Sequence, residues 1–399
     1  MNRALAVLYL AALIDAIGVG LIIPILPALL RHLAGDRPIA VHYGALISTF
    51  ALMQFLCAPV LGALSDRFGR RPILLLSLAG GAADYLLTGF AGSLWVLYLA
   101  RVLGGVTAAN MAVISATIAD LTPEADRARR YGTLNAVMGI GWIAGPILGG
   151  SLGQIWLALP FLAAAGLNGL NLLLAWFLLP EPDRLRDRSP LRLSGMNAFS
   201  SLRRLGSMPL LLPMIGIYCV MCLVGQIPMS IWVLYGQARY GWTPLVVGWS
   251  FACYGLLFAL SQAFLTGPLT RRMGEGGTIL LGMVLDAGGY ALMGLATRGW
   301  MPFAIMPLLS AGGVGLPALQ ASLSGAVGPA RQGELQGTLS SLANLAGVVG
   351  PLLVTLLFAA TLHTLPGTVW FVGVAAYVAC ALLAGSALLG RRTGDRSSE

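Results

Sequence analysis

The chain has 399 residues, of which 57% are hydrophobic and only 10% are charged. Soluble domains usually carry about 25% charged residues, so this composition excludes an ordinary water-soluble fold, and the mean hydropathy of +0.83 agrees. The net charge is +9, and every basic side chain is Arg. Because these arginines lie in short loops between apolar runs, they indicate membrane topology and not a nucleic-acid partner.

The apolar runs predict an all-α membrane protein with about twelve transmembrane helices, since a helix needs roughly 20 apolar residues to cross a bilayer. In chain order, these runs predict spans at roughly 6–29, 44–63, 73–91, 94–119, 133–154, 159–179, 208–235, 245–269, 276–296, 300–325, 337–359 and 366–390.

The loops between these runs predict the orientation. Arg31, Arg37, Arg239 and Arg298 fall on one side, Arg101 falls within a span, and the remaining arginines fall on the opposite side. The positive-inside rule then places both termini in the cytoplasm.

Residues 181–207 form the one long polar connection. We expect an N-terminal six-helix half at 1–180, a cytoplasmic linker at 181–207 and a C-terminal six-helix half at 208–399. A solvated tether is the simplest interpretation of the linker, and a regulatory role is the alternative.

The two halves repeat each other at offsets of about 205 residues. The matching positions are Gly62 and Gly69 with Gly267 and Gly274, Gly145-Pro146 with Gly350-Pro351, and Asp84 with Asp286. Duplicated six-helix halves are typical of the major facilitator superfamily, in which the substrate binds near the membrane midplane between the repeats.

Charged residues lie within the predicted spans. Asp15, Asp84, Asp286 and Arg101 are all seven or more residues inside a span by the boundaries above, roughly at mid-membrane. A charge at the bilayer centre costs at least about 2.5–3.5 kcal/mol, so such residues usually face an aqueous cavity. We predict that they couple transport to protons; a buried ion pair that joins two helices is the alternative, above all for Arg101.

Amide side chains also lie within the spans, at Gln54, Gln226, Gln262 and Gln320. Each can line a substrate cavity or hydrogen-bond to a neighbouring helix. The sequence does not choose between these roles.

The segment 62–72 matches the loop signature of the major facilitator superfamily. Its signature residues are Gly62, Asp66, Arg67, Gly69, Arg70 and Arg71. Glycine permits a tight turn and close helix approach, and an aspartate that pairs with arginine can hold one transport state closed. A cluster of arginines that sets topology explains the basic residues, but not the glycines or the aspartate.

The segment 141–150 matches the fifth-helix signature of drug–proton antiporters. It carries Gly141, Gly145, Pro146, Gly149 and Gly150. Small residues four apart form a close-packed helix face, and proline bends a helix. A simple packing motif is the alternative, but the full pattern favours export.

Over nearly its whole length the chain resembles bacterial tetracycline efflux proteins. The segments that carry the resemblance include 13–18, 42–44, 51–54, 94–98, 225–228, 239–242, 296–300, 316–320 and 332–337. It implies a proton-coupled antiporter of the bacterial inner membrane that exports a small drug, tetracycline as a divalent-metal chelate with Mg²⁺. It also implies a monomer within the lipid bilayer, with no bound cofactor or metal of its own.

The resemblance implies roles for particular residues. Asp15, Asp84, Asp286 and Arg101 match charges within the spans that the family needs for transport, and we expect them to couple protons. Asp120 matches an acidic residue at the cytoplasmic end of the fourth span and joins the gating loop. Apart from the resemblance, the residues that we expect to line the substrate cavity are Gln54, Gln226, Trp232, Phe258, Gln262 and Gln320.

Two segments depart from the family pattern. Phe258 stands where the family has His, and residues 108–112 read Ala-Ala-Asn-Met-Ala where the family has Gly-Ala-Thr-Gly-Ala. A multidrug or metabolite exporter of the same fold is therefore the alternative function. A membrane enzyme would need a nucleophile–base pair or a metal cluster, which the sequence does not indicate, and the retained charges disfavour a non-transporting receptor.

Overall fold

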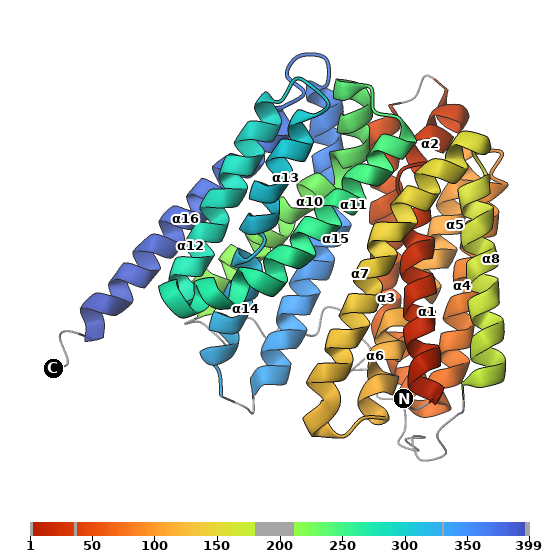
Figure 1. Cartoon of the computed structure of the whole chain (residues 1–399), viewed down its shortest axis with the longest axis horizontal. Coiled ribbons are helices and arrows are strands. Elements are labelled where there is room, and N and C mark those ends of the chain that lie inside the picture. Colours follow the sequence, from red (N-terminus) through yellow and green to blue (C-terminus); the bar gives the residue numbers. More distant parts are fainter. Residues whose placement is uncertain (1–2, 36–37, 180–210, 329–330, 396–399) are drawn as a thin grey trace. The chain divides into compact units, whose positions relative to one another are not determined.

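The computed structural model describes residues 3–35, 38–179, 211–328 and 331–395, with side chains described as far as residue 383. The regular elements within these ranges are helices (Figure 1). The predicted linker at 181–207 lies outside them.

The helices of the first part of the chain are α1 (Arg3–Ile22), α2 (Leu26–Ala34), α3 (Ile39–Phe68), α4 (Arg70–Gly89), α5 (Leu94–Thr107), α6 (Asn110–Asp120), α7 (Glu124–Ile155) and α8 (Leu159–Leu178). Those of the second part are α10 (Leu212–Tyr240), α11 (Pro244–Phe264), α12 (Thr266–Leu295), α13 (Met301–Gly312), α14 (Gly315–Gly325), α15 (Gln332–Thr361) and α16 (Thr368–Asp395).

Eleven stretches of the described residues are helical, long and apolar enough to cross a membrane, and Thr368–Leu383 of α16 is a shorter apolar helix. The predicted all-α membrane fold is thus confirmed. Aromatic side chains stand exposed at the ends of several spans, with Trp95 81%, Trp300 62% and Trp156 54% exposed. Such exposed rings are typical of the interface between membrane and water.

Two of the expected spans consist of two helices each. One is broken between α5 and α6 at Ala108 and Ala109, and the other between α13 and α14 at Gly313 and Val314. At the first break the Thr107 hydroxyl donates to two backbone carbonyls of its own turn, at 2.9 and 3.2 Å. This local bonding competes with the regular helix ladder. Broken helices near the midplane often carry the binding sites of transporters.

The chain forms two compact units. Unit 1 comprises residues 1–198 together with the segment 242–252, and unit 2 comprises residues 199–241 and 253–399. The boundaries expected for the two halves stay a prediction, because the linker lies outside the described residues.

The same helix pairing occurs in each unit. In unit 1, α1 packs on α7 and α8, and α4 packs on α5 and α8. In unit 2, α10 packs on α15 and α16, and α12 packs on α13 and α16. The predicted internal repeat of two six-helix halves is therefore confirmed at the level of tertiary packing.

The repeat extends to backbone conformation. Gly69, between α3 and α4, has a φ of 104°, and Gly274, at the kink of α12, has a φ of 72°. Side chains other than glycine rarely adopt positive φ. The two glycines matched in the sequence thus make equivalent turns.

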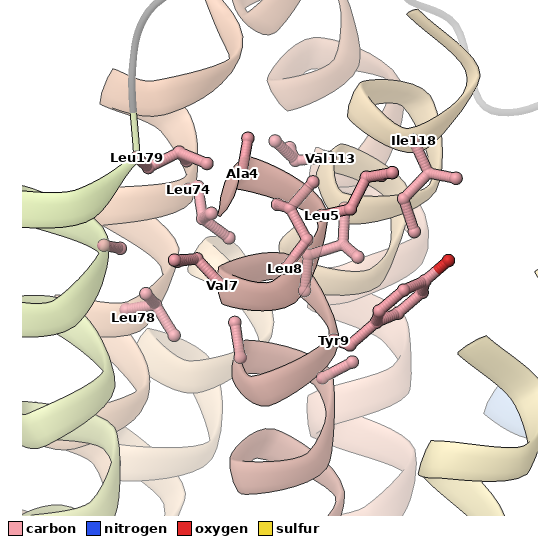
Figure 2. Close-up of a cluster of buried hydrophobic side chains, with 14 of the residues drawn as sticks. Ala4, Leu5, Val7, Leu8, Tyr9, Leu74, Leu78, Val113, Ile118 and Leu179 are labelled. Carbon is pink, nitrogen blue, oxygen red and sulfur yellow. The ribbon is translucent and has the colours of Figure 1, made fainter. Parts of the chain in front are cut away.

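The first turns of α1 are held in a core of unit 1. Leu5 and Leu8 of α1 pack with Leu74 of α4, Val113 of α6 and Leu179, just after α8 (Figure 2). All are buried, and each fully buried leucine contributes roughly 1.5–3 kcal/mol relative to exposure. This core fixes the part of α1 that leads to Asp15.

Candidate transport site

Arg101 of α5 and Asp84 of α4 form an ion pair within the membrane-spanning part of unit 1. The Arg101 Nη2 atom lies 2.6 Å from the Asp84 Oδ1 atom and also donates to the Thr88 hydroxyl at 3.0 Å. Only 2% of Asp84 is exposed. The ion pair that was the alternative interpretation is therefore formed, and a role of these two residues in proton coupling stays a prediction.

Asp15 of α1 has a different partner. The Asn110 Nδ2 atom donates to the Asp15 Oδ1 atom at 2.6 Å. Asn110 is the first residue of α6, directly after the break in the fourth span. Sequence reasoning assigned it no role; the available signal was its position within the segment 108–112 that departs from the family pattern.

Asp286 of α12 lies among aromatic side chains of unit 2. The Tyr377 hydroxyl of α16 lies within hydrogen-bonding reach of the Asp286 carboxylate. The Tyr377 ring packs edge-on against Tyr290, with 5.5 Å between centroids, and Tyr254 of α11 is close enough to interact electrostatically with Asp286. Sequence reasoning missed these tyrosines, since buried tyrosines in apolar spans resemble ordinary packing residues.

Phe258 and Gln262 of α11 meet the break between α13 and α14. The Gln262 Nε2 atom donates to the Gly313 carbonyl at 3.0 Å, and a Cβ atom on Gly313 would lie 2.5 Å from the Phe258 ring. Tyr254, one turn earlier on α11, stacks on Phe258 at 5.9 Å. Because Gly312, next to Gly313, lies against the Asp286 carboxylate, the predicted residues Phe258, Gln262 and Asp286 belong to one region of unit 2.

Two other predicted cavity residues make contacts between helices. The Gln320 Nε2 atom of α14 donates to the Tyr218 hydroxyl of α10 at 3.2 Å. The Gln226 side chain of α10 packs against Gly350 of α15, where a Cβ atom would lie 2.5 Å from it. Their role as helix contacts is visible in the structure, and a role in substrate binding stays a prediction.

The last two predicted cavity residues have different surroundings. Gln54 of α3 is exposed. Trp232 of α10 is buried, and its ring packs edge-on against Trp370 with 6.3 Å between centroids. The buried position of Trp232 gives its predicted cavity role no support, and that role stays a prediction.

The predicted gating loop forms a charged network at the junction of α3 and α4. The Arg70 guanidinium pairs with Asp66 and, at 3.0 Å, with Asp120 at the end of α6. It also donates to the Ser65 hydroxyl at 3.4 Å. One arginine thus joins the ends of three helices, which is the arrangement expected of a latch.

The two neighbouring arginines do not enter this network. Arg71 donates to the carbonyl of Trp176 on α8 and lies 5.9 Å from its ring centroid. Arg67 lies over the ring of Phe68 at 5.5 Å. Arg71 therefore ties α4 to α8.

The predicted antiporter motif forms the contact face of α7. A Cβ atom on Gly141 would lie 2.6 Å from Ala16, and one on Gly145 would lie 2.8 Å from Gly20, both on α1. Gly149 continues the same face against Leu21. The glycines four residues apart let the backbones of α1 and α7 touch directly.

The other two motif residues complete this contact surface. A Cβ atom on Gly20 would lie 2.8 Å from the Pro146 ring, so the proline packs on α1. Gly150 faces the backbone of Pro244, in the segment 242–252 that belongs to unit 1. The packing interpretation of the motif is therefore correct in this structure, and its role in antiport stays a prediction.

Among the described residues there is no group of three or more His, Cys, Asp or Glu side chains that could hold a metal ion. The three carboxylates within the spans each have a partner in their own unit. Asp84 is paired with Arg101, Asp15 with the amide of Asn110, and Asp286 with the hydroxyl of Tyr377. Such groups can exchange protons and bind polar parts of a solute within a membrane.

Comparison with known proteins gives one consistent result. The Major Facilitator Superfamily profile matches residues 8–243 and 214–398. The chain is 50% identical to the class C tetracycline resistance protein of Escherichia coli, over 95% of this chain and 96% of that one. It is 48% identical to the class G tetracycline resistance protein of Vibrio anguillarum, over 92% and 93%. The crystal structure of the nucleoside transporter NupG is similar in fold, with a TM-score of 0.78 at 13% identity, over 96% of this chain and 99% of that one.

Proposed function

Because the chain belongs to the major facilitator superfamily and, within it, to the tetracycline resistance proteins, we propose that it exports tetracycline from the cytoplasm in exchange for protons. It is a transporter and not an enzyme. The observation that carries the proposal is the set of carboxylates at Asp15, Asp84 and Asp286 within the membrane spans, each held by a specific polar or charged partner.

Transport of this kind is secondary and active. Carboxylates within the spans take up protons from the side of higher proton activity, and their protonation opposes binding of the substrate. The substrate is a small molecule, tetracycline as its Mg²⁺ chelate, so the metal ion crosses the membrane as part of the cargo. The region around Asp286, Phe258 and Gln262 offers a carboxylate, an aromatic ring and an amide to such a ligand.

The protein acts as a monomer in the bacterial inner membrane, with both termini in the cytoplasm. The support for this orientation is the distribution of arginines between loops. The Arg70 network then lies at the cytoplasmic side, where Asp66 and Asp120 hold α3, α4 and α6 together. Opening of this latch accompanies the change between outward-facing and inward-facing states.

The experiment is tetracycline uptake, in the presence of Mg²⁺, by inverted membrane vesicles that contain this chain. We expect uptake driven by an imposed proton gradient and abolished by an uncoupler. Vesicles with Asp286→Asn provide the control and should take up no tetracycline. Uptake that is equal with and without the gradient would contradict proton exchange, and no uptake at all would contradict the cargo.

Phe258 favours one alternative cargo. This residue is 36% exposed and stands where the family sequence has a titratable histidine. An exporter that lacks this group can prefer another amphipathic drug or a metabolite. A gradient-dependent signal for another drug, without tetracycline uptake, would support this alternative.

A further inference from the structure

The Asp15–Asn110 pair leaves one buried atom without a partner. The Asn110 amide nitrogen donates to Asp15, but the amide oxygen of Asn110 is buried and accepts no hydrogen bond among the described residues. A buried acceptor without a donor is unfavourable, because it has lost its hydrogen bonds to water and gained none within the protein. Native structures usually avoid this arrangement, so the atom calls for an explanation.

Protonation of Asp15 would supply the missing donor. An ionised carboxylate can only accept hydrogen bonds, whereas a protonated carboxyl has one O–H donor and a remaining acceptor. A primary amide has both a donor and an acceptor on one plane. The two groups together can therefore form a two-bond pair, in which the amide N–H donates to one carboxyl oxygen and the carboxyl O–H donates to the amide oxygen.

We propose that Asp15 and Asn110 form the proton-binding pair of unit 1, in which Asn110 is a positioning residue that bonds once to the ionised carboxylate and twice to the protonated carboxyl. The proton comes from water and binds the free carboxyl oxygen, and it returns to water when the pair reverts to one bond. No other bond is made or broken. The proposal rests on the proposed proton exchange and adds the residue that distinguishes the two protonation states.

The surroundings distinguish Asp15 from Asp84. Asp84 faces the guanidinium of Arg101, a permanent positive charge that favours the ionised carboxylate. Asp15 has the neutral amide of Asn110 as its hydrogen-bond partner. Tyr85 of α4 is a titratable group close to this part of α1, since its hydroxyl would lie 3.7 Å from a Cβ atom on Gly18.

The remaining helices around Asp15 contribute uncharged contacts. At the neighbouring positions of α1, Ala16 meets Gly141 of α7 and Gly18 meets Asn168 of α8. The hydrogen bond to the Asp15 carboxylate comes from Asn110.

The pair also links protonation to helix α6. Asp15 lies on α1, whereas Asn110 begins α6 after the break at Ala108 and Ala109. A change from one hydrogen bond to two would therefore alter how tightly α6 is held to α1. The other end of α6 carries Asp120, which pairs with Arg70 in the latch. The family pattern has Thr at position 110, whose shorter side chain carries a hydroxyl in place of the amide.

Infrared difference spectroscopy of the purified full-length protein tests the pair without any drug. Spectra are recorded as the pH is stepped between about 4 and 9, a range that covers carboxyls displaced by burial, and Asp15→Asn identifies the carboxyl C=O band of Asp15. We expect this band to shift to higher wavenumber in Asn110→Leu, because the protonated carboxyl loses both hydrogen bonds. Asn110→Thr should give a smaller shift, and it serves as the test if the Leu variant does not fold.

Asn135→Leu is the matched control, because Asn135 is an exposed amide on α7, and its spectrum should equal that of the parent protein. An Asp15 band at the same wavenumber in the parent and in both Asn110 variants would overturn the proposal. So would the absence of a titrating Asp15 band. If the Asp15 band shifts in the Asn110 variants but the protein transports no tetracycline, the Asp15–Asn110 pair is still supported. Only the proposed cargo is then contradicted.

Discussion

Gly104 of α5 lies directly against the carboxylate of Asp84 on α4, so that a Cβ atom on Gly104 would be 2.5 Å from the Asp84 Oδ2 atom. Unit 2 repeats this relationship, since a Cβ atom on Gly312 would overlap the Asp286 Oδ1 atom. In each unit, a glycine in the helix that precedes the break makes room for an intramembrane aspartate. The duplication therefore preserves the surroundings of the carboxylate as well as the helix pairing.

The Gly312→Ala variant should lose transport, because its methyl group would displace the Asp286 carboxylate. Overpacking of this kind costs about 1–3 kcal/mol, and we expect proton-driven tetracycline uptake per molecule of protein to fall about tenfold or more. Gly216→Ala is the control, since a Cβ atom there meets nothing within 4 Å. Equal uptake by both variants in vesicles would show that the glycine contact has no functional consequence.

Removal of one member of the Asp84–Arg101 pair should destabilise the protein. Arg101→Gln leaves a buried carboxylate without its cation, and the loss of one partner of a buried pair typically costs about 3–5 kcal/mol. The double variant Asp84→Asn with Arg101→Gln should be more stable than Arg101→Gln alone, because it leaves no unpaired charge. Thermal unfolding of the purified proteins in detergent measures this double-mutant cycle; additive effects of the two substitutions would contradict a stabilising pair.

The fold could be predicted from the sequence because hydrophobic runs of membrane length leave few alternatives. The pairs Gly69 with Gly274 and Asp84 with Asp286 already indicated the duplication. Hydropathy did not predict the breaks within the fourth and tenth spans. Helix propensity did not predict the first break either, since Ala108 and Ala109 are good helix formers. At the first break the Thr107 hydroxyl bonds within its own turn.

The charged residues of the candidate site could be predicted because a charge within an apolar run is conspicuous. Their partners could not, since Asn110 and Tyr377 are distant in sequence from Asp15 and Asp286 and are not charged. Hydrogen-bond partners of this kind depend on which helices pack together. Trp232 illustrates the converse, because it was predicted to line the cavity and the structure buries it against Trp370.

The glycine face of α7 gives a prediction about assembly of unit 1. Gly145→Ala should reduce the amount of folded protein, since the new Cβ would lie 2.8 Å from the backbone of Gly20 and force α1 and α7 apart. Gly139→Ala on the same helix is the control, because nothing lies within 4 Å of its Cβ position, and alanine there improves helix propensity by up to about 1 kcal/mol. Size-exclusion chromatography of the detergent-solubilised variants measures the difference; two equally monodisperse proteins would contradict it.

The fork geometry of Arg70 should be essential for the latch. Arg70→Lys keeps the charge but cannot reach Asp66 and Asp120 with separate nitrogens of a planar group, so we expect uptake to fall with a normal amount of protein in the membrane. Arg129→Lys is the control, because its pair with Asp126 is 3.3 Å long and largely exposed, and exposed pairs contribute little. Vesicle uptake normalised to protein measures both variants, and unimpaired uptake by Arg70→Lys would show that charge alone is sufficient.

A histidine at position 258 should add a titratable group to the region of Asp286. The imidazole would stand beside Gly313 and stack on Tyr254, and histidine is the side chain whose ordinary pKa, about 6.5, places its charge change between about pH 5 and 8. We therefore expect Phe258→His to retain proton-driven tetracycline uptake and to gain an inflection in its pH profile within this range. Phe264→His on the same helix is the control, because Phe264 is 69% exposed and its replacement should leave the profile unchanged. A profile for Phe258→His that matches the parent would mean that the residue at 258 does not communicate with Asp286, and that the proton passes only through the carboxylates and their present partners.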